Sequence, residues 1–224
     1  MNVTVLDREV YSMGEAARLL RVPRATLRSW IDGYTRAGIH YEPVIRETST
    51  GKNVVTWGEF VEAGYLNQYR RRGVSLQSLR PVVQILRERL GVPYPLAHAK
   101  PYLSGRELVM AVQTETGLPA ELAMVVIRNG QMVLDPRAEA FLRKVEFSPG
   151  DAEGAVRRLH PYERSRSVVI DPLRAFGAPA VRGVRTENIF ELCVAGDSIE
   201  AIARSYDLSV AEVEAAVSYE REIA

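Results

Sequence analysis

The first residues whose types and spacing suggest chemistry lie on one short predicted helix after Pro23. A proline is tolerated at a helix start, and Leu27, Trp30 and Ile31 recur there at helical spacing to form an apolar side. Arginines reach guanine edges and phosphates, and hydroxyls reach phosphates. We therefore expect contacts with double-stranded operator DNA in the major groove from the polar residues of the opposite side, namely Arg24, Thr26, Arg28 and Ser29.

A second short helix is predicted just before this one. Ala16, Ala17 and Leu20 recur at helical spacing, and Arg21–Pro23 separates the two helices. Two short helices joined by such a turn form a helix-turn-helix, and its second helix enters the major groove. Residues 11–31 alone leave one alternative open, which is a structural helical hairpin with a solvated basic face.

A wing is predicted directly after the second helix. Two β-prone runs, residues 43–46 and 53–56, flank a Ser-Thr-Gly-Lys turn and indicate a hairpin. We expect Arg46 and Lys52 to contact the sugar-phosphate backbone from this hairpin.

Two further helices are predicted after the wing. Thr56 and Glu59 have the spacing of a capping box, which predicts a helix through Tyr69 that the cations and glycine of residues 70–73 close. The next helix is expected over residues 74–90, where leucines and valines recur at steps of three and four.

Residues 10–90 resemble the winged helix-turn-helix of the MerR family. The resemblance rests on three motifs, YSxGEAARLL at 11–20, TLRxW at 26–30 and GVSL at 73–76. It implies that residues 1–92 form a DNA-binding domain. The chain after Gly91 departs from the family pattern, because its sequence indicates neither a long dimerisation helix nor an effector domain.

Charge is unevenly distributed along the 224 residues. Residues 1–100 hold 15 Lys and Arg against 9 Asp and Glu, a balance of +6. The remaining residues hold 14 against 19, a balance of −5. A basic half beside an acidic half indicates a nucleic-acid surface and a different partner for the rest.

The common catalytic and metal-binding motifs are absent from the sequence. GxSxG, P-loop, HExxH and CxxC patterns do not occur, and His40, His98 and His160 are isolated. The single Cys193 is expected to be a core residue and fits a reducing cytoplasm. With no apolar run of eighteen residues, we expect a cytoplasmic protein without membrane contact, catalytic activity or cofactor.

Residues 93–165 are predicted to form a connecting α/β region without a functional site. The strongest signal is Asn129-Gly130 between β-prone runs, which predicts a hairpin over 125–134. Helices are expected on either side of it, over 103–116 and 137–144.

The last residues, 166–224, are predicted to form a small helical domain. Helices are expected over 187–195, from Ser198 onward, and over 210–219, each after a Ser or Thr cap. The last two have helix-turn-helix spacing, but the final helix carries Glu212 and Glu214. Because phosphates would repel these acids, we expect this copy to bind protein.

Residues 168–220 resemble the C-terminal domain of VapB-type antitoxins. The motifs are Asp171-Pro172, GxPxVxGxR at 177–185, AGDSI at 195–199 and YxLS at 206–209. The resemblance implies a PIN-like ribonuclease toxin as partner, with an acidic, Mg²⁺-binding active site. We expect Arg182 and Arg185 to contact its carboxylates, since arginine binds them in bidentate fashion. The alternative is that Arg185 only ties the turn to its own domain.

The sequence thus predicts a mainly α fold with small β-hairpins, in which a winged helix-turn-helix precedes a C-terminal, helix-turn-helix-like domain. We expect an antitoxin and autorepressor that binds an inverted repeat as a homodimer. The alternatives are a MerR-like transcription regulator that senses a small effector through residues 92–165, and a structural adaptor. The candidate dimer surface consists of apolar residues on the C-terminal helices, Ile189, Leu192, Cys193, Ile199, Ile202 and Val213.

Overall fold

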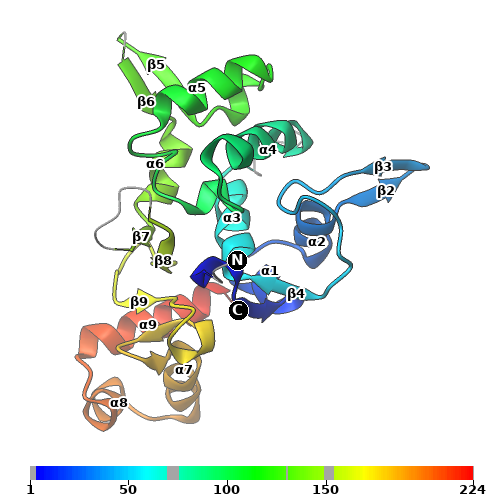
Figure 1. Ribbon diagram of the computed structural model, residues 1–224. Helices are drawn as coiled ribbons and strands as arrows, with labels where there is room; N and C mark the ends of the chain where they lie inside the picture. Colours follow the sequence, from blue (N-terminus) through cyan, green and yellow to red (C-terminus); the bar gives the residue numbers. More distant parts are fainter. Residues whose placement is uncertain (1–3, 70–75, 130, 149–153, 224) are drawn as a thin grey trace. The chain divides into compact units, whose positions relative to one another are not determined.

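The computed structural model describes residues 4–69, 76–129, 131–148 and 154–223. About half of the chain is helical, and the strands form small antiparallel sheets (Figure 1), in agreement with the predicted mainly α fold with small hairpins. The chain divides into an N-terminal unit, Met1–Arg143 with Phe147–Val156, and a C-terminal unit, Lys144–Glu146 with Arg157–Ala224. The units differ from the predicted boundaries at 92/93 and 165/166. Within the described ranges, no helix has the length and apolar character to cross a membrane.

The N-terminal unit begins with the two predicted helices of the helix-turn-helix. A 3₁₀ turn, η1 (Val5–Asp7), and strand β1 (Glu9–Ser12) lead into α1 (Met13–Leu20) and α2 (Arg24–Asp32). The Ser12 hydroxyl accepts a hydrogen bond from the Glu15 N–H and caps α1. Arg21, in the left-handed conformation at φ 54°, ends α1 and sets the turn.

Strand β4 (Val54–Thr56) pairs with β1 in antiparallel register, with Tyr11 opposite Val55. The predicted hairpin between residues 43–46 and 53–56 is therefore wrong. Residues 43–45 form a buried loop instead, because the Val44 and Ile45 N–H groups both donate to the Trp30 carbonyl, at 2.9 and 3.0 Å.

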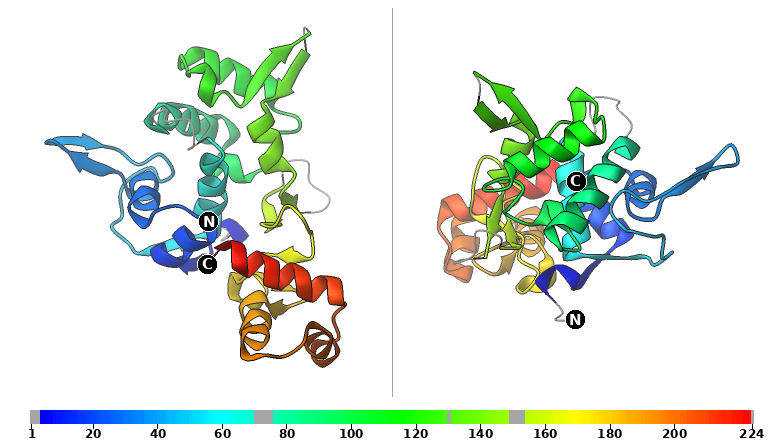
Figure 2. Two further views of the ribbon diagram at one scale, coloured as in Figure 1. Left: turned by 180° about the vertical axis from the view of Figure 1, so that it is seen from behind. Right: turned by 45° about the horizontal axis from the view of Figure 1, so that its top comes forward.

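A different hairpin follows α2 after a single residue. Strands β2 (Tyr34–Arg36) and β3 (Ile39–Tyr41) form a two-stranded antiparallel sheet. The views of Figures 1 and 2 show this hairpin projecting from the N-terminal unit. This hairpin was not predicted from the sequence.

Helix α3 (Trp57–Asn67) is the central element of the N-terminal unit. It begins with the predicted capping box, since the side chains of Thr56 and Glu59 each accept the other residue's N–H. The predicted end of this helix at residues 70–73 lies outside the described residues. The helix predicted over 74–90 is observed as η3 (Leu76–Ser78) and α4 (Leu79–Leu90), which ends at Gly91.

The rest of the N-terminal unit comes from the region predicted to be a connection. Its predicted hairpin is confirmed as β5 (Val125–Arg128) and β6 (Gln131–Leu134). The predicted helices are α5 (Arg106–Glu115) and α6 (Pro136–Leu142), and 3₁₀ turns η4 (Pro95–Ala97) and η5 (Ala120–Leu122) complete it.

Buried contacts explain why this region packs with the N-terminal helices. The rings of Tyr65, Tyr102 and Phe141 meet with centroids 5.4 to 6.0 Å apart. The Glu62 carboxyl group on α3 accepts the Leu96 N–H at 2.9 Å, and the Tyr69 hydroxyl donates to a backbone carbonyl at 3.3 Å. Burial of these aromatic groups stabilises the packing of this region against α3.

In the C-terminal unit, three helices pack beside a small sheet. The division between the units falls within β7 (Val145–Phe147) and β8 (Val156–Leu159). The sheet has the order β11-β10-β9, and the 3₁₀ turn η6 precedes β10. The bounds are β9 (Val168–Val169), η6 (Ala175–Gly177), β10 (Ala180–Val181), β11 (Val184–Arg185), α7 (Thr186–Ala195), α8 (Ile199–Tyr206) and α9 (Val210–Ile223).

The core of this unit corrects the proposed dimer surface. Ile189, Ile202 and Val213 are 0 to 1% exposed and pack together in the core of the unit. Side chains so deeply buried cannot meet a second copy without unfolding, so these three are removed from the surface. Leu192, Cys193 and Ile199 are partly buried against the same core.

Candidate functional site

Helix α2 has one buried side and one exposed side, as the sequence predicts. Leu27, Trp30 and Ile31 are buried. Arg24 and Arg28 are exposed on the opposite side, and Thr26 and Ser29 are half-buried. The helix thus presents two guanidinium groups to solvent.

The polar side chains of α2 differ in whether they already form hydrogen bonds within the protein. Arg24 donates to the Asn53 side-chain oxygen at 3.0 Å, which holds the start of α2 beside the loop before β4. The Ser29 hydroxyl donates to the Thr26 carbonyl at 2.7 Å, so its proton is used within the helix. Among the described residues, Arg28 has no hydrogen-bond or ion-pair partner.

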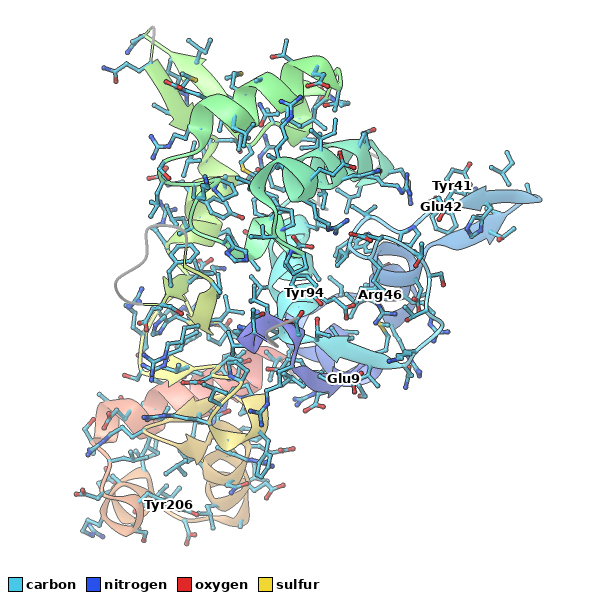
Figure 3. The ribbon with its side chains drawn as sticks, viewed as in Figure 1. Glu9, Tyr41, Glu42, Arg46, Tyr94 and Tyr206 are labelled. Carbon is cyan, nitrogen blue, oxygen red and sulfur yellow. The ribbon has the colours of Figure 1, made fainter. Side chains whose placement is uncertain are left out.

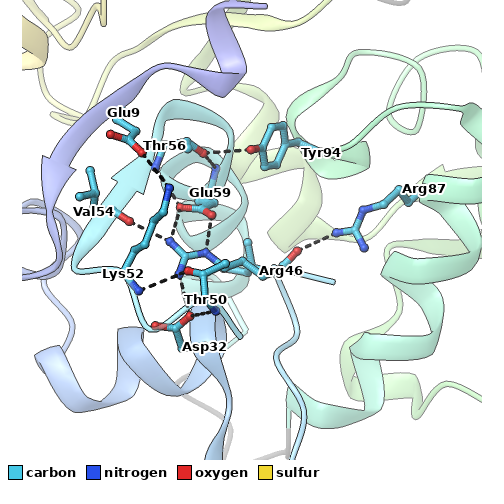
Figure 4. Close-up of polar contacts among 11 residues, drawn as sticks. Glu9, Asp32, Arg46, Thr50, Lys52, Val54, Thr56, Glu59, Arg87 and Tyr94 are labelled. Atoms are coloured by element: carbon cyan, nitrogen blue, oxygen red, sulfur yellow. Dashed lines mark hydrogen bonds and ion pairs between the residues drawn. The ribbon is translucent and has the colours of Figure 1, made fainter. Parts of the chain in front are cut away.

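Arg46 belongs to a buried ion-pair cluster, shown in Figure 4. Its guanidinium donates to Asp32 Oδ1 and Glu59 Oε1, each at 2.6 Å, and to the Val54 carbonyl at 2.8 Å. The side chains of Arg46, Asp32 and Glu59 are 9%, 7% and 6% exposed. The predicted backbone contact by Arg46 is corrected accordingly, because its donors are committed to carboxylates inside the fold.

The cluster holds its charges despite burial. Burial alone would lower the pKa of Arg46, but hydrogen bonds and the charges of Glu59 and Asp32 raise it. Burial likewise opposes ionisation of Asp32, while the Thr50 N–H and Arg46 lower its pKa. Arg46 therefore acts as a structural tie between the end of α2, the following loop and the start of α3.

Lys52 lies on an exposed loop next to the residue that holds Arg24. Its side chain is 66% exposed, and its ammonium is 3.7 Å from Glu9 Oε1. Such an exposed pair contributes little to stability and is easily exchanged for another anion. The structure thus places Arg24, Arg28 and Lys52 at accessible positions and removes Arg46 from this group.

The loop after the β2–β3 hairpin also borders a pocket of about 460 Å³. Arg80 donates to the Pro43 carbonyl at 3.1 Å, and Arg87 donates to the Ile45 and Pro93 carbonyls at 2.6 and 2.7 Å. The two arginines line the pocket with Val92 and Pro93. It is a ligand-sized hollow in the N-terminal unit, and it lies mostly outside the predicted effector region 92–165.

In the C-terminal unit, the two predicted arginines occupy different environments. Arg182 is exposed, and its guanidinium donates to the Asp207 carbonyl at 2.9 Å. Arg185 is half-buried, and its guanidinium carbon lies 5.7 Å from the centroid of the Phe176 ring. Arg182 is thus tied to its own unit, while Arg185 lies beside an exposed aromatic side chain.

Phe176 itself is 82% exposed, and Leu173 is 59% exposed. Ala175 and Phe176 both adopt left-handed backbone conformations, at φ 48° and 56°. Consecutive residues of this kind are uncommon without glycine and mark a strained loop. This loop was not predicted from the sequence, although an apolar Phe before Gly177 in a turn-rich segment was an available signal.

No group of three or more His, Cys, Asp or Glu side chains that could hold a metal ion occurs in the described part of the chain. His160 Nε2 lies 2.6 Å from Glu146 Oε1, and its Nδ1 lies 3.0 Å from the Arg166 carbonyl oxygen. Both partners belong to the C-terminal unit. This arrangement is a structural hydrogen-bond pair.

Two family models match the chain at its ends. Residues 9–83 match a family described as "Putative DNA-binding HTH domain", and residues 168–219 match one described as "Protein of unknown function (DUF433)". The first match covers α1, α2 and the hairpin. The fold and this match together define a protein with an N-terminal helix-turn-helix domain.

Two relatives from Mycobacterium tuberculosis extend over nearly the whole chain. Uncharacterized protein Rv2308 is 38% identical over 98% of this chain and 93% of that protein. A protein named "Putative antitoxin VapB45" is 31% identical over 91% of this chain and 90% of that protein. The chain therefore belongs to the family of these two proteins.

The crystal structure of Rv2018 from the same organism is also similar. It superposes with a TM-score of 0.77 at 27% sequence identity, over 96% of this chain and 100% of that chain. The arrangement of elements described above is thus shared with a protein solved by experiment.

Proposed function

We propose that this chain is an antitoxin that binds its own operator DNA as a repressor. The observation that carries the DNA-binding part is the exposed side of α2, where Arg24 and Arg28 face solvent opposite a fully buried apolar side. An arginine with no other partner is the side chain best suited to the acceptors of guanine in the major groove. Lys52 adds a phosphate contact from the neighbouring loop.

The repressor is proposed to act as a homodimer on an inverted repeat. One α2 helix offers too few base contacts for operator affinity, whereas two helices on half-sites about 10 base pairs apart, or a multiple of that, supply enough. Sedimentation of the free protein and of its DNA complex measures this directly. A single chain per DNA duplex would contradict the proposal.

The C-terminal unit is proposed to bind a PIN-like ribonuclease toxin. This part rests on the antitoxin name of a relative 31% identical to the chain and on the exposed loop beside Arg185. An arginine next to an exposed aromatic ring combines a carboxylate donor with an apolar anchor, a pairing common at protein interfaces. The protein itself then needs neither metal nor cofactor, and its role is binding without catalysis.

The experiment that tests both parts uses the full chain and the gene beside it. We expect co-expression with the adjoining gene to yield a stable complex and to suppress that gene's toxicity. We also expect the purified chain to bind its own promoter more tightly than an unrelated duplex. Absence of any complex contradicts the antitoxin role, and equal affinity for both duplexes contradicts operator recognition.

A transcription regulator that responds to a small effector is the second candidate. The pocket of about 460 Å³ lined by Arg80 and Arg87 favours it, because arginines bind carboxylates and phosphates. Arg46 also lines this pocket and connects it with the end of α2. A small anion that changes promoter affinity, and that no longer does so after Arg80→Ala, would support this candidate over the antitoxin.

A further inference from the structure

The β5–β6 hairpin has one edge whose main chain is already bonded to a side chain. The buried Gln113 amide on α5 accepts the Val125 N–H at 3.0 Å and donates to the Val125 carbonyl at 2.9 Å. It also accepts the Met124 N–H at 2.7 Å. Because an amide carries both a donor and an acceptor, this side chain takes the place of a neighbouring strand at the start of β5.

The register of the hairpin shows which main-chain groups of β6 point outward. Hydrogen-bonded and non-hydrogen-bonded pairs alternate along an antiparallel ladder. The Asp135 N–H donates to the Met124 carbonyl at 2.8 Å, so Val133, two residues earlier on β6, also bonds inward to β5. The N–H and C=O groups of Met132 and Leu134 therefore point away from β5, and no hydrogen bond among the described residues uses them. They form the open edge of β6.

This open edge lacks the features that usually keep edge strands from pairing. Such strands commonly carry lysine, proline or a bulge. Strand β6, with the sequence QMVL, has no charged residue and no proline, and its register with β5 is regular. The cross-strand partners Ile127 and Met132 are 66% and 36% exposed, so apolar surface lies beside the edge. A further strand on β6 would satisfy the open groups and cover part of this surface.

The position of the hairpin leaves the predicted DNA-binding helix uncovered. Figures 1 and 2 show β5–β6 at the opposite end of the N-terminal unit from the β2–β3 hairpin, which directly follows α2 and on which Figure 3 labels Tyr41. A chain that binds to the β6 edge therefore does not cover Arg24 and Arg28 on α2.

We propose that β6 pairs in antiparallel orientation with β6 of a second copy of the chain. This inference rests on the proposed homodimer and names its surface. The strand is self-complementary about a two-fold axis at Val133, because Met132 of each copy then lies opposite Leu134 of the other, and their open N–H and C=O groups bond to each other. Since β6 is uncharged, no like charges meet across the axis. The two hairpins form one continuous sheet, and its two-fold axis is the symmetry that an inverted repeat requires.

Proline substitutions on the two edges test the pairing in the free, full-length chain. Met132→Pro removes an outward N–H from β6, and the matched control Ile127→Pro removes the outward N–H of its cross-strand partner on β5. Neither removes a hydrogen bond within the hairpin, so similar melting temperatures are expected for the two variants. By sedimentation, we expect Met132→Pro to raise the dimer dissociation constant on the order of thirty-fold, because each copy loses a hydrogen bond and leaves a carbonyl without its donor. Ile127→Pro should dimerise like the wild type.

A cysteine at the proposed axis gives a second measurement, which does not depend on weakening the dimer. Opposite residues of a non-hydrogen-bonded antiparallel pair have Cα atoms about 4.5 Å apart, a distance that suits a disulfide. With Cys193 replaced by Ser, we expect Val133→Cys to form a disulfide-linked dimer on mild oxidation. Val126→Cys is the matched control, since Val126 is also half-buried but lies opposite Val133 on β5, away from the axis. It should not form the linked dimer.

Three results would overturn the inference. If Met132→Pro dimerises like Ile127→Pro and Val133→Cys is linked no better than Val126→Cys, the dimer surface lies elsewhere, with operator recognition by α2 left standing. A wild-type chain that is monomeric both free and on DNA would refute the homodimer itself. Loss of toxin binding by Met132→Pro, with the dimer intact, would assign the edge to a strand of the toxin. If the wild type does not bind the promoter, operator recognition is refuted, while the proline and cross-linking results still decide the pairing.

Discussion

Arg46 Nη1 lies 2.6 Å from Asp32 Oδ1, which joins the last residue of α2 to the loop that follows the hairpin. The same oxygen accepts the Thr50 N–H at 3.1 Å, so one carboxylate fixes two points of the loop. The position of α2 therefore depends on a buried ion pair whose partners are 14 residues apart in sequence.

This relationship predicts a large loss of stability for Arg46→Ala. Removal of the guanidinium leaves the Asp32 and Glu59 carboxylates buried without their cation, which typically costs about 3–5 kcal/mol in the free energy of unfolding. Lys52→Ala is the matched control, since its exposed pair with Glu9 is worth at most about 1 kcal/mol. Urea denaturation of both variants measures the difference, and equal losses would contradict the structural role of Arg46.

A second prediction concerns DNA reading by α2. Because Arg28 is exposed and lies on the opposite side from the core, Arg28→Ala should leave the melting temperature unchanged. It should weaken promoter binding by about 1–3 kcal/mol and relax the preference at one base position. Binding of a set of single-base promoter variants checks this. Arg128→Ala is the control, and an unchanged base preference in Arg28→Ala would remove it from the interface.

Glu62 gives a prediction about pH. This carboxyl is fully buried, and burial raises its pKa to about 8, although the Leu96 N–H and the charge of Arg87 oppose the shift. Its pKa in the unfolded chain is near 4.5, so the folded state holds the proton more tightly. The stabilising contribution is complete below pH 4.5 and is lost as the pH rises through 8, with a slope of at most about 1.4 kcal/mol per pH unit.

The variant that tests this is Glu62→Gln, which keeps an acceptor for the Leu96 N–H. At pH 5 we expect it to be about as stable as the wild type, because the protonated carboxyl and the amide both place a donor where the Glu62 Oε2 atom has no partner. Between pH 5 and 8.5 the wild type should lose stability relative to the variant. Parallel pH profiles of the unfolding free energy would contradict the prediction, and the exposed Glu139→Gln serves as control.

The sequence predicted the elements whose ends are set locally. The Thr56–Glu59 capping box and Gly91 mark helix ends through contacts with neighbours in sequence, and the observed helices agree. The β2–β3 hairpin was missed because its turn, Ala37-Gly38, lacks the usual Asn-Gly or Asp-Gly signal. A pattern of β-prone residues on both sides of that glycine was the signal available.

Contacts between distant residues account for the remaining errors. Arg46 was placed on a wing because its type and local pattern fit one, while its partners Asp32 and Glu59 cannot be chosen from spacing alone. Similarly, the region after Gly91 has linker-like prolines, yet Leu96 packs at the buried Glu62. In both cases the role of the residue depends on which distant segment buries it. The periodicity of apolar residues does not show which segment that is.

The final prediction concerns the toxin and the loop beside Arg185. Phe176 is the most exposed large apolar side chain among the described residues, and its strained backbone holds it outward in the absence of a partner. A preorganised aromatic anchor loses little entropy on binding, so Phe176→Ala should weaken the complex with the toxin by at least about ten-fold. Arg185→Ala should also weaken the complex if its guanidinium contacts carboxylates, with a loss of affinity that is smaller at high salt.

Val210→Ala and Arg204→Ala, at exposed positions on α9 and α8, are the controls. Titration of the toxin's nuclease activity with each full-length variant gives the affinities. If Phe176→Ala and Arg185→Ala both inhibit the nuclease as well as the wild type does, with promoter binding intact, the toxin-binding surface lies elsewhere on the chain.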